Sequence, residues 1–571
     1  MRHLLHPKNA YGPIYFMVIS ACLIALQLNN LPAQSLPRAL QLNSMEGSFY
    51  LPDFSYAGYK CGEYDIPKDS GQVIYAQDYG VIPDDGIDDS DSLIQVMNLI
   101  NSIEGKVTLQ LPPGRIILSD ILFIERGDLI IKGSGSGALG TEIYCPRPMM
   151  YMPDTEILKE LREYLKKFDK RQVEPQNNID LPFSQYAWAG GVIWTHVPGE
   201  RVKSYLSKYD VPPKVKAHIL TGERGTHVLT ASEVIDLKVG DVVQLQLFNH
   251  EGSSKSKIIV DLYKSSDVNI GSHHWNFPQL PIVRQELEIV DIVGNEIHVK
   301  TPLTITIDPE YNARIVEWKH LKEVGIQNFK ITFPDAPYVA HHVEPGNNAI
   351  YLTRLFDSWV QDVVIHNADS GILTEEIANV TIKDIVTQGQ NKAHYTVAMA
   401  GVHNVLVENL KVFNLAEHPL SFNTFSTKNV YKNCQVHVKP ILDQHSGANH
   451  QNLFDQIIVY IDSKDETQYP LFAGGGAGYW KPSHGAYNTF WNIEVIYKNG
   501  LDSPNQKLLY GMSDGPYANL IGIHSNHDIK VEYGPDAYLE NINAKINKVP
   551  SLYDYQLQER LTLKPKEIYK N

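Results

Sequence analysis

The sequence predicts an all-β fold, a right-handed parallel β-helix, and three observations support this prediction. The chain has 571 residues, more than most single compact domains contain. It is 43% hydrophobic and 20% charged, which is enough apolar surface for a large core and too little charge for general disorder. From about residue 323 onward, a motif of Asn or Asp, an apolar residue, any residue and usually an aliphatic residue recurs at intervals of 22 to 37 residues.

This repeat is typical of a solenoid, in which each unit buries its apolar face against its neighbours. The segments are rich in β-branched and aromatic residues with period two, and none has helix length. Four consecutive intervals are 22, 25, 24 and 22 residues, and the two longest intervals predict projecting loops. Asn and Asp at a repeated turn tolerate left-handed backbone and can stack in ladders. The polar positions are Asn328, Asp362, Asp384, Asn409, Asn433, Asp455 and Asn492.

Residues 1–34 are predicted to be a secretory signal peptide. Arg2 and Lys8 precede an apolar stretch at residues 14–26, and the small Ala33 offers a cleavage site. The stretch is too short for a membrane span. We therefore expect a secreted or periplasmic protein; a surface lipoprotein attached through Cys22 is the less favoured alternative.

Residues 35–150 are predicted to form an N-terminal cap and the first coils. An amphipathic helix begins at Asp89 or Ser90, ends before Gly105, and covers the open end of the solenoid. The acidic residues 84–89 are therefore interpreted as structural. The inner face of the helix consists of Leu93, Val96, Met97 and Ile100.

The stretches "DYGVIPDDGIDDS", "LQLPPGRIIL" and "LIIKGSGSG" resemble the opening of the pectate-lyase-like superfamily of secreted β-helix proteins. Val81 stands where the superfamily pattern has Ala, Ser90 stands where it has Thr, and an additional Pro-Asp lengthens the acidic turn. The resemblance covers roughly residues 73–145. It implies the fold and carbohydrate chemistry as a class, but not the reaction, because the superfamily includes lyases, hydrolases and phage tailspikes.

Residues 151–318 are predicted to interrupt the solenoid with a helix at 154–171 and a small antiparallel β-subdomain. Two hairpins are expected within residues 234–305, one of them with a turn at Gly294-Asn295. His273 and His274 are interpreted as loop residues. The coils then occupy residues 319–550 and carry the site, and residues 551–571 form a C-terminal tail.

Histidines and carboxylates gather in these coils. Ten of the 22 histidines lie between His341 and His484, and histidines or carboxylates follow four consecutive polar positions by 8 to 14 residues. With a rise of about 4.8 Å per coil, equal offsets become neighbours on one face. The predicted catalytic residues are His394, Tyr395, Glu417, His418, Asp443 and His445. The predicted substrate-binding residues are His342, Glu344, Arg354, Asn423, Trp480 and His484.

The preferred function is a polysaccharide lyase that cleaves a uronate-containing, pectic or sulfated algal glycan by β-elimination. In this hypothesis the histidines transfer protons, Tyr395 protonates the leaving oxygen, Arg354 neutralises a carboxylate, and Glu417 and Asp443 orient imidazoles. No short motif fixes a metal ligand set, and calcium is one candidate ion. The net charge of −15 disfavours nucleic acid as a partner. A monomer is expected.

Three other functions remain open. A glycoside hydrolase would use Glu417 with Asp443, or the pair Glu375 and Glu376. A dehydratase would eliminate water from a terminal uronate with the same groups as the lyase. A non-catalytic carbohydrate-binding protein would bind sugar without turnover.

Overall fold

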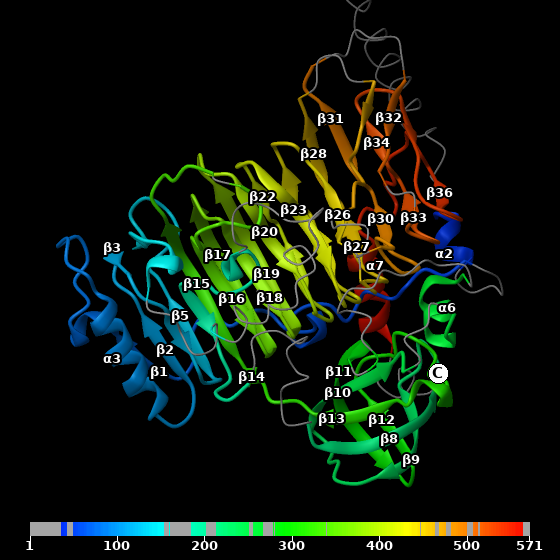
Figure 1. Ribbon diagram of the computed structural model, residues 1–571, viewed down its shortest axis with the longest axis horizontal. Helices are drawn as coiled ribbons and strands as arrows, with labels where there is room; N and C mark the ends of the chain where they lie inside the picture. Colours follow the sequence, from blue (N-terminus) through cyan, green and yellow to red (C-terminus); the bar gives the residue numbers. More distant parts are fainter. Residues whose placement is uncertain are drawn as a thin grey trace, which may run out of the picture.

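The computed structural model describes residues 36–42, 49–152, 159, 184–200, 213–250, 255–265, 278, 280–338, 340–445, 447–462, 467–474, 481–499, 506–511 and 514–563. The predicted signal peptide, the helix predicted at 154–171 except for Lys159, and His273 and His274 lie outside the described residues. Figure 1 shows an elongated stack of parallel strands with a small barrel docked beside it. The predicted parallel β-helix is confirmed.

The coils between the two ends contribute strands to three elongated rows (Figure 1). The first row consists of β1 (Gln72–Tyr75), β2 (Val107–Gln110), β5 (Leu129–Lys132), β15 (Val324–Thr332), β17 (Leu355–His366), β19 (Ala378–Gln388), β21 (Leu406–Glu408), β24 (Val430–Lys432), β27 (Leu453–Asp455), β30 (Thr489–Trp491), β33 (Asn519–Ile521) and β36 (Tyr538–Glu540). The short β14 (Leu321–Lys322) also pairs with β17.

The long strands β15, β17 and β19 bend and continue into the second row. The other members of that row are β3 (Gly114–Ile117), β6 (Thr141–Tyr144), β22 (Lys411–Val412), β25 (Gln435–Val436), β28 (Ile458–Ile461), β31 (Glu494–Tyr497) and β34 (His524–Ser525).

The third row is a seven-stranded parallel sheet, followed by a three-stranded one. The seven-stranded sheet contains β4 (Leu122–Ile124), β7 (Ile193–Thr195), β16 (Asn348–Thr353), β18 (Ser370–Glu375), β20 (Ala393–Met399), β23 (Ala416–Asn423) and β26 (Leu442–His445). The three-stranded sheet contains β29 (Gln468–Tyr469), β32 (Lys507–Leu509) and β35 (Ile529–Val531).

The repeated polar residues occupy the bend between the first and second rows. Six of the seven predicted positions have positive φ, between 51° and 65°. Asp455 is the exception, because the left-handed residue of its coil is Gln456, at φ 55°. The turn chemistry therefore explains the period: each bend needs a residue that adopts left-handed backbone at low cost.

The core consists of inward side chains stacked in register from coil to coil. Tyr431, Phe454 and Phe490 are paired neighbours in the first row, with ring centroids 5.6 and 5.1 Å apart. A buried asparagine ladder runs beside them: the side-chain oxygen of Asn452 accepts from the backbone N–H of Asn429, and that of Asn488 accepts from Asn452. This ladder satisfies turn amides that water cannot reach.

The N-terminal cap is helix α3 (Ser90–Asn101), and its predicted inner residues are buried in the β-helix core. Figure 1 shows it at the end of the solenoid beside β1 and β2. Asp89 precedes the helix but makes no side-chain cap. Its carboxylate instead accepts from the backbone N–H of Ile82 and Ile117, at 2.9 and 3.0 Å. Through these two hydrogen bonds, the carboxylate of Asp89 has a structural role in the acidic turn.

The predicted β-subdomain is a closed six-stranded antiparallel barrel. Residues 151–318 are nevertheless not one inserted unit, since β7 belongs to the seven-stranded sheet between β4 and β16. The expected turn at Gly294-Asn295 joins the last hairpin. Phe425 and Ala448, from turns of the β-helix, are buried in the barrel core, which fixes the barrel against the coils. The strands are β8 (Val215–Gly222), β9 (Val228–Val234), β10 (Val242–Phe248), β11 (Pro281–Val293), β12 (Glu296–Val299) and β13 (Arg314–Glu317).

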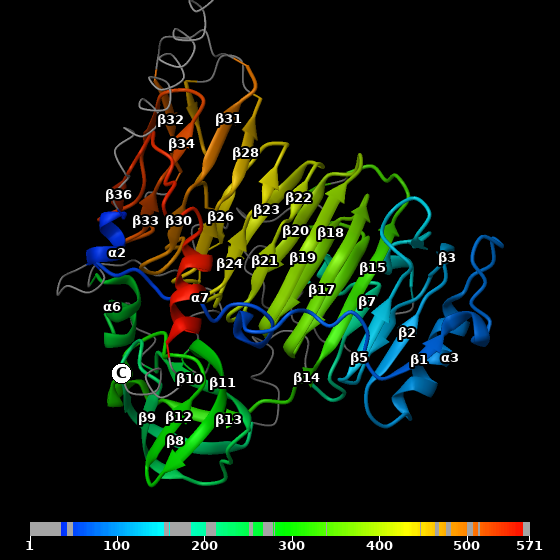
Figure 2. The same ribbon diagram turned by 180° about the vertical axis from the view of Figure 1, so that it is seen from behind.

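Both ends of the described chain pack along the first row (Figure 2). The segment expected to be a C-terminal tail begins with helix α7 (Leu552–Thr562). The hydroxyl of Tyr553 donates to the carbonyl of Ala57, and Arg560 donates to the carbonyl of Ser55. The other α-helices among the described residues are α2 (Arg38–Leu42) and α6 (Lys257–Tyr263). Among the described residues, no helix has the length and apolar character that a membrane crossing requires.

Candidate active site

A histidine–carboxylate cluster lies on the seven-stranded sheet. It comprises His341, His342, Glu344, His394, His418, Asp443 and His445, and its members come from the loop before β16 and from strands β20, β23 and β26. Tyr395 pairs in register with His418, and Asn423 pairs with His445. The prediction that coil stacking brings the spaced histidines and carboxylates into one patch agrees with this geometry for His394, His418, Asp443 and His445. It is wrong for Glu375 and Glu376, which lie at the C-terminal end of β18 and just beyond it.

Asp443 is the centre of one half of the cluster. It follows the core residue Leu442, so strand alternation directs its side chain to the outer face of the sheet. One carboxylate oxygen, Oδ2, lies 3.0 Å from Nδ1 of His418 and 3.3 Å from Nδ1 of His445. The same oxygen accepts from the hydroxyl of Ser421 at 2.6 Å, and Ser421 in turn accepts from the Asn423 amide at 2.9 Å.

The electrostatics of Asp443 follow from these partners. Its side chain is 1% exposed, and burial alone would raise the pKa of the carboxyl. The two imidazoles outweigh burial and hold the pKa of Asp443 well below its usual range. Asp443 is therefore a permanent carboxylate that orients two imidazoles, the arrangement used where histidine transfers protons.

His394 lies between Glu344 and His418, and it connects the two halves of the cluster: one half is centred on Asp443, and the other contains His341, His342 and Glu344. Its ring stacks on Tyr395 with centroids 4.2 Å apart and lies 5.5 Å from the ring of His418. The side chain is 1% exposed, and burial, followed by the neighbouring imidazoles His418 and His341, holds its pKa well below the ordinary value. Tyr395 is 4% exposed and packs with the β-helix core. Its ring thus supports the imidazoles of His394 and His418.

The other half of the cluster comes from the loop between β15 and β16. Oε1 of Glu344 lies 3.4 Å from Nδ1 of His394 and 3.7 Å from Nδ1 of His341. Burial raises the pKa of Glu344 to about 7. His341 was missed among the predicted site residues, although it belongs to the "HHVEPGNN" stretch that contains His342 and Glu344. Its loop belongs to a longer interval, where equal offsets no longer identify neighbours.

Glu417 does not orient a histidine as predicted. It is half-exposed and forms an ion pair with Lys392 at the edge of the cluster. Although burial opposes the effect, the Lys392 ammonium lowers the pKa of Glu417. His418 and Glu417 are adjacent on β23, and the imidazole of His418 turns to Asp443 instead.

Arg354 is not brought to the cluster. It follows Thr353, which pairs with Glu375 at the C-terminal end of β18, whereas Tyr395 pairs with Ser370 at the N-terminal end. At about 3.3 Å per residue these two ends are about 16 Å apart. Arg354 instead pairs with Glu376, which also contacts the buried Arg284.

His484 is not available to a substrate. It is completely buried, its Nδ1 donates to the carbonyl of Gly485, and its Nε2 accepts from the hydroxyl of Tyr533 at 2.8 Å. Burial lowers the pKa of His484 to about 4, so the ring is a neutral core group. Trp480 lies outside the described residues.

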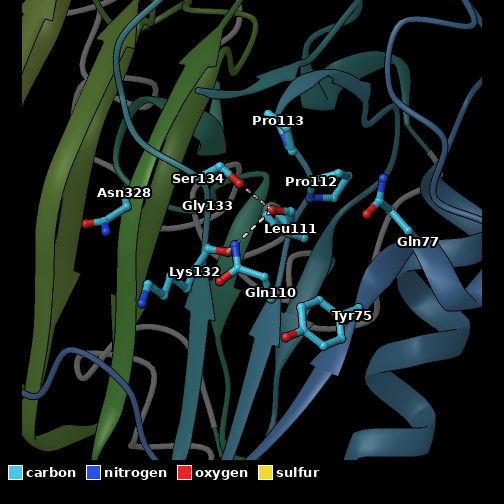
Figure 3. A pocket seen from close by; sticks show the side chains of 10 residues that line it. All are labelled: Tyr75, Gln77, Gln110, Leu111, Pro112, Pro113, Lys132, Gly133, Ser134 and Asn328. Atoms are coloured by element: carbon cyan, nitrogen blue, oxygen red, sulfur yellow. Dashed lines mark hydrogen bonds between the residues drawn. The ribbon is translucent and has the colours of Figure 1, made fainter. Parts of the chain in front are cut away.

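The motif that carries the superfamily resemblance forms a separate surface pocket (Figure 3). Leu111, Pro112 and Pro113 line it, and Ser134 donates to the carbonyl of Leu111 at 3.1 Å. Lys132 is the only charged residue among those that line this pocket, and it pairs with Asp69. No carboxylate or imidazole lines this pocket, and the part of the motif that forms it makes structural contacts within the first coils.

The chain resembles several solved structures at low identity. The tailspike protein gp49 from Pseudomonas phage LKA1 has 11% identity and a TM-score of 0.44, covering 82% of this chain and 80% of that chain. DFA-IIIase from Arthrobacter chlorophenolicus A6, without its lid, has 11% identity and a TM-score of 0.39, covering 84% and 98%. The A-module of mannuronan C-5 epimerase AlgE4 from Azotobacter vinelandii has 9% identity and a TM-score of 0.32, covering 83% and 97%.

No protein-family model matches the sequence, and no curated protein matches it. The strand register defines the class of protein: a parallel β-helix with a buried histidine–carboxylate cluster on one sheet. This is the fold that the resemblance to the pectate-lyase-like superfamily implies.

Proposed function

We propose that this protein is a secreted carbohydrate-active enzyme that cleaves a uronate-containing polysaccharide by β-elimination at the histidine–carboxylate cluster. The observation that carries the proposal is the carboxylate of Asp443 between His418 and His445, at 3.0 and 3.3 Å. Carbohydrate chemistry as a class is supported by the N-terminal motif, and elimination by the predominance of imidazoles over unpaired carboxylates.

The elimination needs one proton acceptor and one proton donor. One imidazole removes the proton from C5 of the uronate, the C5–H electron pair forms the C4–C5 double bond, and the C4–O bond breaks. The departing oxygen then takes a proton from the second, protonated imidazole. His445 is the more exposed of the two imidazoles on Asp443, so we assign it the C5 proton and assign His418 the leaving oxygen.

A cation must offset the charge of the uronate carboxylate, and Lys392 is better placed for this role than Arg354. Lys392 pairs with Glu417, and its ammonium lies 4.6 Å from the ring centroid of Tyr338. Lys392 and Tyr338 line a crevice together with Glu344 and Asp369, directly beside the cluster. An incoming carboxylate would exchange with Glu417 at the Lys392 ammonium.

Three of the four carboxylates that a hydrolase was expected to use are engaged in other contacts. Asp443 accepts from three donors and is buried, Glu417 pairs with Lys392, and Glu376 contacts two arginines. A glycoside hydrolase needs one carboxylate free for water or for the anomeric carbon. These contacts favour elimination over hydrolysis.

The test is incubation of the purified chain with alginate, pectate, ulvan, glycosaminoglycans and neutral glycans. Ultraviolet absorbance of the C4–C5 double bond and the number of reducing ends are followed together. Elimination predicts that both rise on one uronate substrate. New reducing ends without absorbance would identify a hydrolase, and absence of both on every glycan would contradict the proposal.

The site assignment is tested with His445→Ala and His418→Ala on the active substrate. We expect kcat to fall by about 100-fold or more in each, because a positioned acid or base contributes about 10²–10⁴. His218→Ala, an exposed histidine on the barrel strand β8, is the matched control and should keep wild-type activity. Full activity in both cluster variants would refute the assignment.

A further inference from the structure

The half of the cluster that the proposed proton transfer does not use has the composition of a metal site. His341, His342 and His394 each offer one ring nitrogen, and these atoms all lie within 4.8 Å of one another. They come from two segments that are more than fifty positions apart in the sequence, since His341 and His342 precede β16 and His394 lies in β20. Convergence of three imidazoles on one point is common at transition-metal sites.

Glu344 adds an oxygen to the same point. Its Oε1 lies 3.4 Å from Nδ1 of His394 and 3.7 Å from Nδ1 of His341, and it accepts from the backbone N–H of His342 at 3.2 Å. That backbone contact holds the carboxylate against the loop that carries both histidines. Glu344 thus faces two of the imidazoles from within a shared loop.

Several of these atoms are buried without a hydrogen bond. His394 is 1% exposed, and neither of its ring nitrogens has a hydrogen-bond partner. The same holds for Nδ1 of His341 and for Oε2 of Glu344. A buried polar atom left unpaired costs about 1–3 kcal/mol, so a group of four such atoms in one place is unfavourable unless a ligand satisfies them.

The neighbouring half of the cluster has fewer such atoms: among the described residues, Nε2 of His418 also lacks a hydrogen-bond partner. Nδ1 of His418 and Nδ1 of His445 both lie within hydrogen-bonding or ion-pair distance of Asp443. These two rings therefore have a carboxylate that fixes them, whereas Glu344 must serve His341 and His394 at longer distances. The unpaired atoms of His341, Glu344 and His394 identify the half of the cluster that contains them as the ligand site.

The donor set selects the kind of ion. Neutral imidazole nitrogens suit zinc and the neighbouring first-row metals, whereas calcium is bound through six to eight oxygen atoms. Zn–N bonds of about 2.0–2.1 Å place tetrahedral ligand atoms about 3.4 Å apart. The nitrogens need to approach one another by about 1 Å or more from the 4.8 Å limit, a shift within reach of side-chain rotation.

We propose that this protein binds one divalent transition-metal ion, with Zn²⁺ as the representative, through His341, His342 and His394 with Glu344 as the oxygen ligand. Binding of the ion does not depend on the proposed reaction. The role of the ion does rest on the proposed function. Beside Lys392, the ion would add positive charge at the place where the uronate carboxylate binds.

The experiment measures binding and not turnover. Tag-free protein is stripped with a chelator, dialysed, and titrated with Zn²⁺ by calorimetry, with bound metal counted by elemental analysis. We expect one Zn²⁺ per chain. Co²⁺ in place of Zn²⁺ should give the visible absorption of a nitrogen-rich, four-coordinate ion.

Variants locate the site. His394→Ala should weaken Zn²⁺ binding by more than about 100-fold, since loss of an outer-shell partner alone costs about 10–100-fold. Glu344→Gln keeps the shape of the side chain, so this variant should fold even if His394→Ala fails to fold. It should weaken Zn²⁺ binding and change the Co²⁺ spectrum. His445→Ala is the matched control from the other half of the cluster and should still bind one ion.

The proposal is overturned if the stripped chain binds no Zn²⁺ at one per chain, or binds Ca²⁺ in preference. It is also overturned if His445→Ala loses the ion and Glu344→Gln retains it unchanged. Failure of the two proposals is distinguishable. Stoichiometric Zn²⁺ without product on any glycan refutes only the lyase function, whereas product without Zn²⁺ binding refutes only the metal site.

Discussion

Asp443 illustrates how a single buried carboxylate organises the candidate site. It has 1% exposure and three donors, two of them imidazoles on different strands. Taking a charge out of water is unfavourable unless neighbouring groups compensate. Here His418, His445 and Ser421 provide that compensation, so the carboxylate stays ionised and both rings keep one orientation.

Asp443→Asn should therefore retain the fold and lose activity. The amide has nearly the same shape, but it cannot stabilise a positive imidazole during proton transfer. We expect kcat to fall by about 100-fold or more with a smaller change in KM, because the loss falls on the proton-transfer step. The measurement is steady-state kinetics on the substrate identified above.

Asp91→Asn, on the exposed side of α3, is the matched control and should behave like the wild type. Activity within a factor of about two of wild type in Asp443→Asn would show that the carboxylate does not serve proton transfer.

Individual site residues were predictable where coils are regular. His394, His418, Asp443 and His445 follow their polar positions at similar offsets, and stacking places such residues side by side. Arg354 was misplaced because its position precedes the bend, at the other end of the sheet. An offset along the sequence identifies neighbouring coils but does not identify which end of a strand a side chain occupies.

At the scale of elements, hydrogen bonds at the end of one coil attach the C-terminal helix to the β-helix. Asp455 ends β27, and its carboxylate accepts from the hydroxyl of Ser551 at 2.6 Å and from the backbone N–H of Tyr553 at 3.0 Å. Ser551 caps α7 and accepts from the backbone N–H of Asp554. A residue predicted as one more member of the repeat thus connects the C-terminal helix to the solenoid.

Asp455→Ala should loosen α7 and leave the candidate site intact. Without the carboxylate, the first backbone N–H groups of the helix lose buried acceptors, and each such loss costs about 1–3 kcal/mol. We expect faster hydrogen–deuterium exchange in peptides covering residues 551–562, with unchanged exchange in β23 and β26. Equal exchange of α7 in Asp455→Ala and wild type would contradict this role.

At the scale of the whole molecule, several histidines are core residues. Nδ1 of His403 is hydrogen-bonded to the hydroxyl of Thr427, and Nδ1 of His450 donates to the carbonyl of Ala448. Nε2 of His484 accepts from the hydroxyl of Tyr533. Burial lowers the pKa of His403 to about 3 and those of His450 and His484 to about 4. The β-helix buries them as neutral rings: Nδ1 of each ring and Nε2 of His484 are hydrogen-bonded, whereas Nε2 of His403 and Nε2 of His450 have no hydrogen-bond partner.

These three rings should remain neutral as the pH falls from 7 to 5. Between pH 6.5 and about 4 the unfolded chain binds protons on these histidines that the folded chain does not. The free energy of unfolding therefore falls as the pH is lowered through this window, by about 1.4 kcal/mol per pH unit for each ring. Buried Asp455 acts in the opposite direction, because burial raises its pKa to about 7. Site-specific titration therefore tests the prediction better than overall stability does.

Hydrogen–deuterium exchange at the histidine C2 position, followed by mass spectrometry, reports the pKa of each ring. We expect no titration midpoint above pH 5 for His403, His450 and His484, with the exposed His218 as the internal reference. Midpoints near 6.5 in all three would show that these rings are not buried as described.

The sequence by itself determined the parallel β-helix, its bend residues, the capping helix and the gathering of histidines in the later coils. These features follow from local backbone preferences and from a repeat that stacks in register. The tertiary structure decided which histidines share a carboxylate, that Arg354 and His484 lie elsewhere, and that His341 joins the site. Those outcomes depend on strand ends, loop paths and burial, which arise only when distant segments pack together.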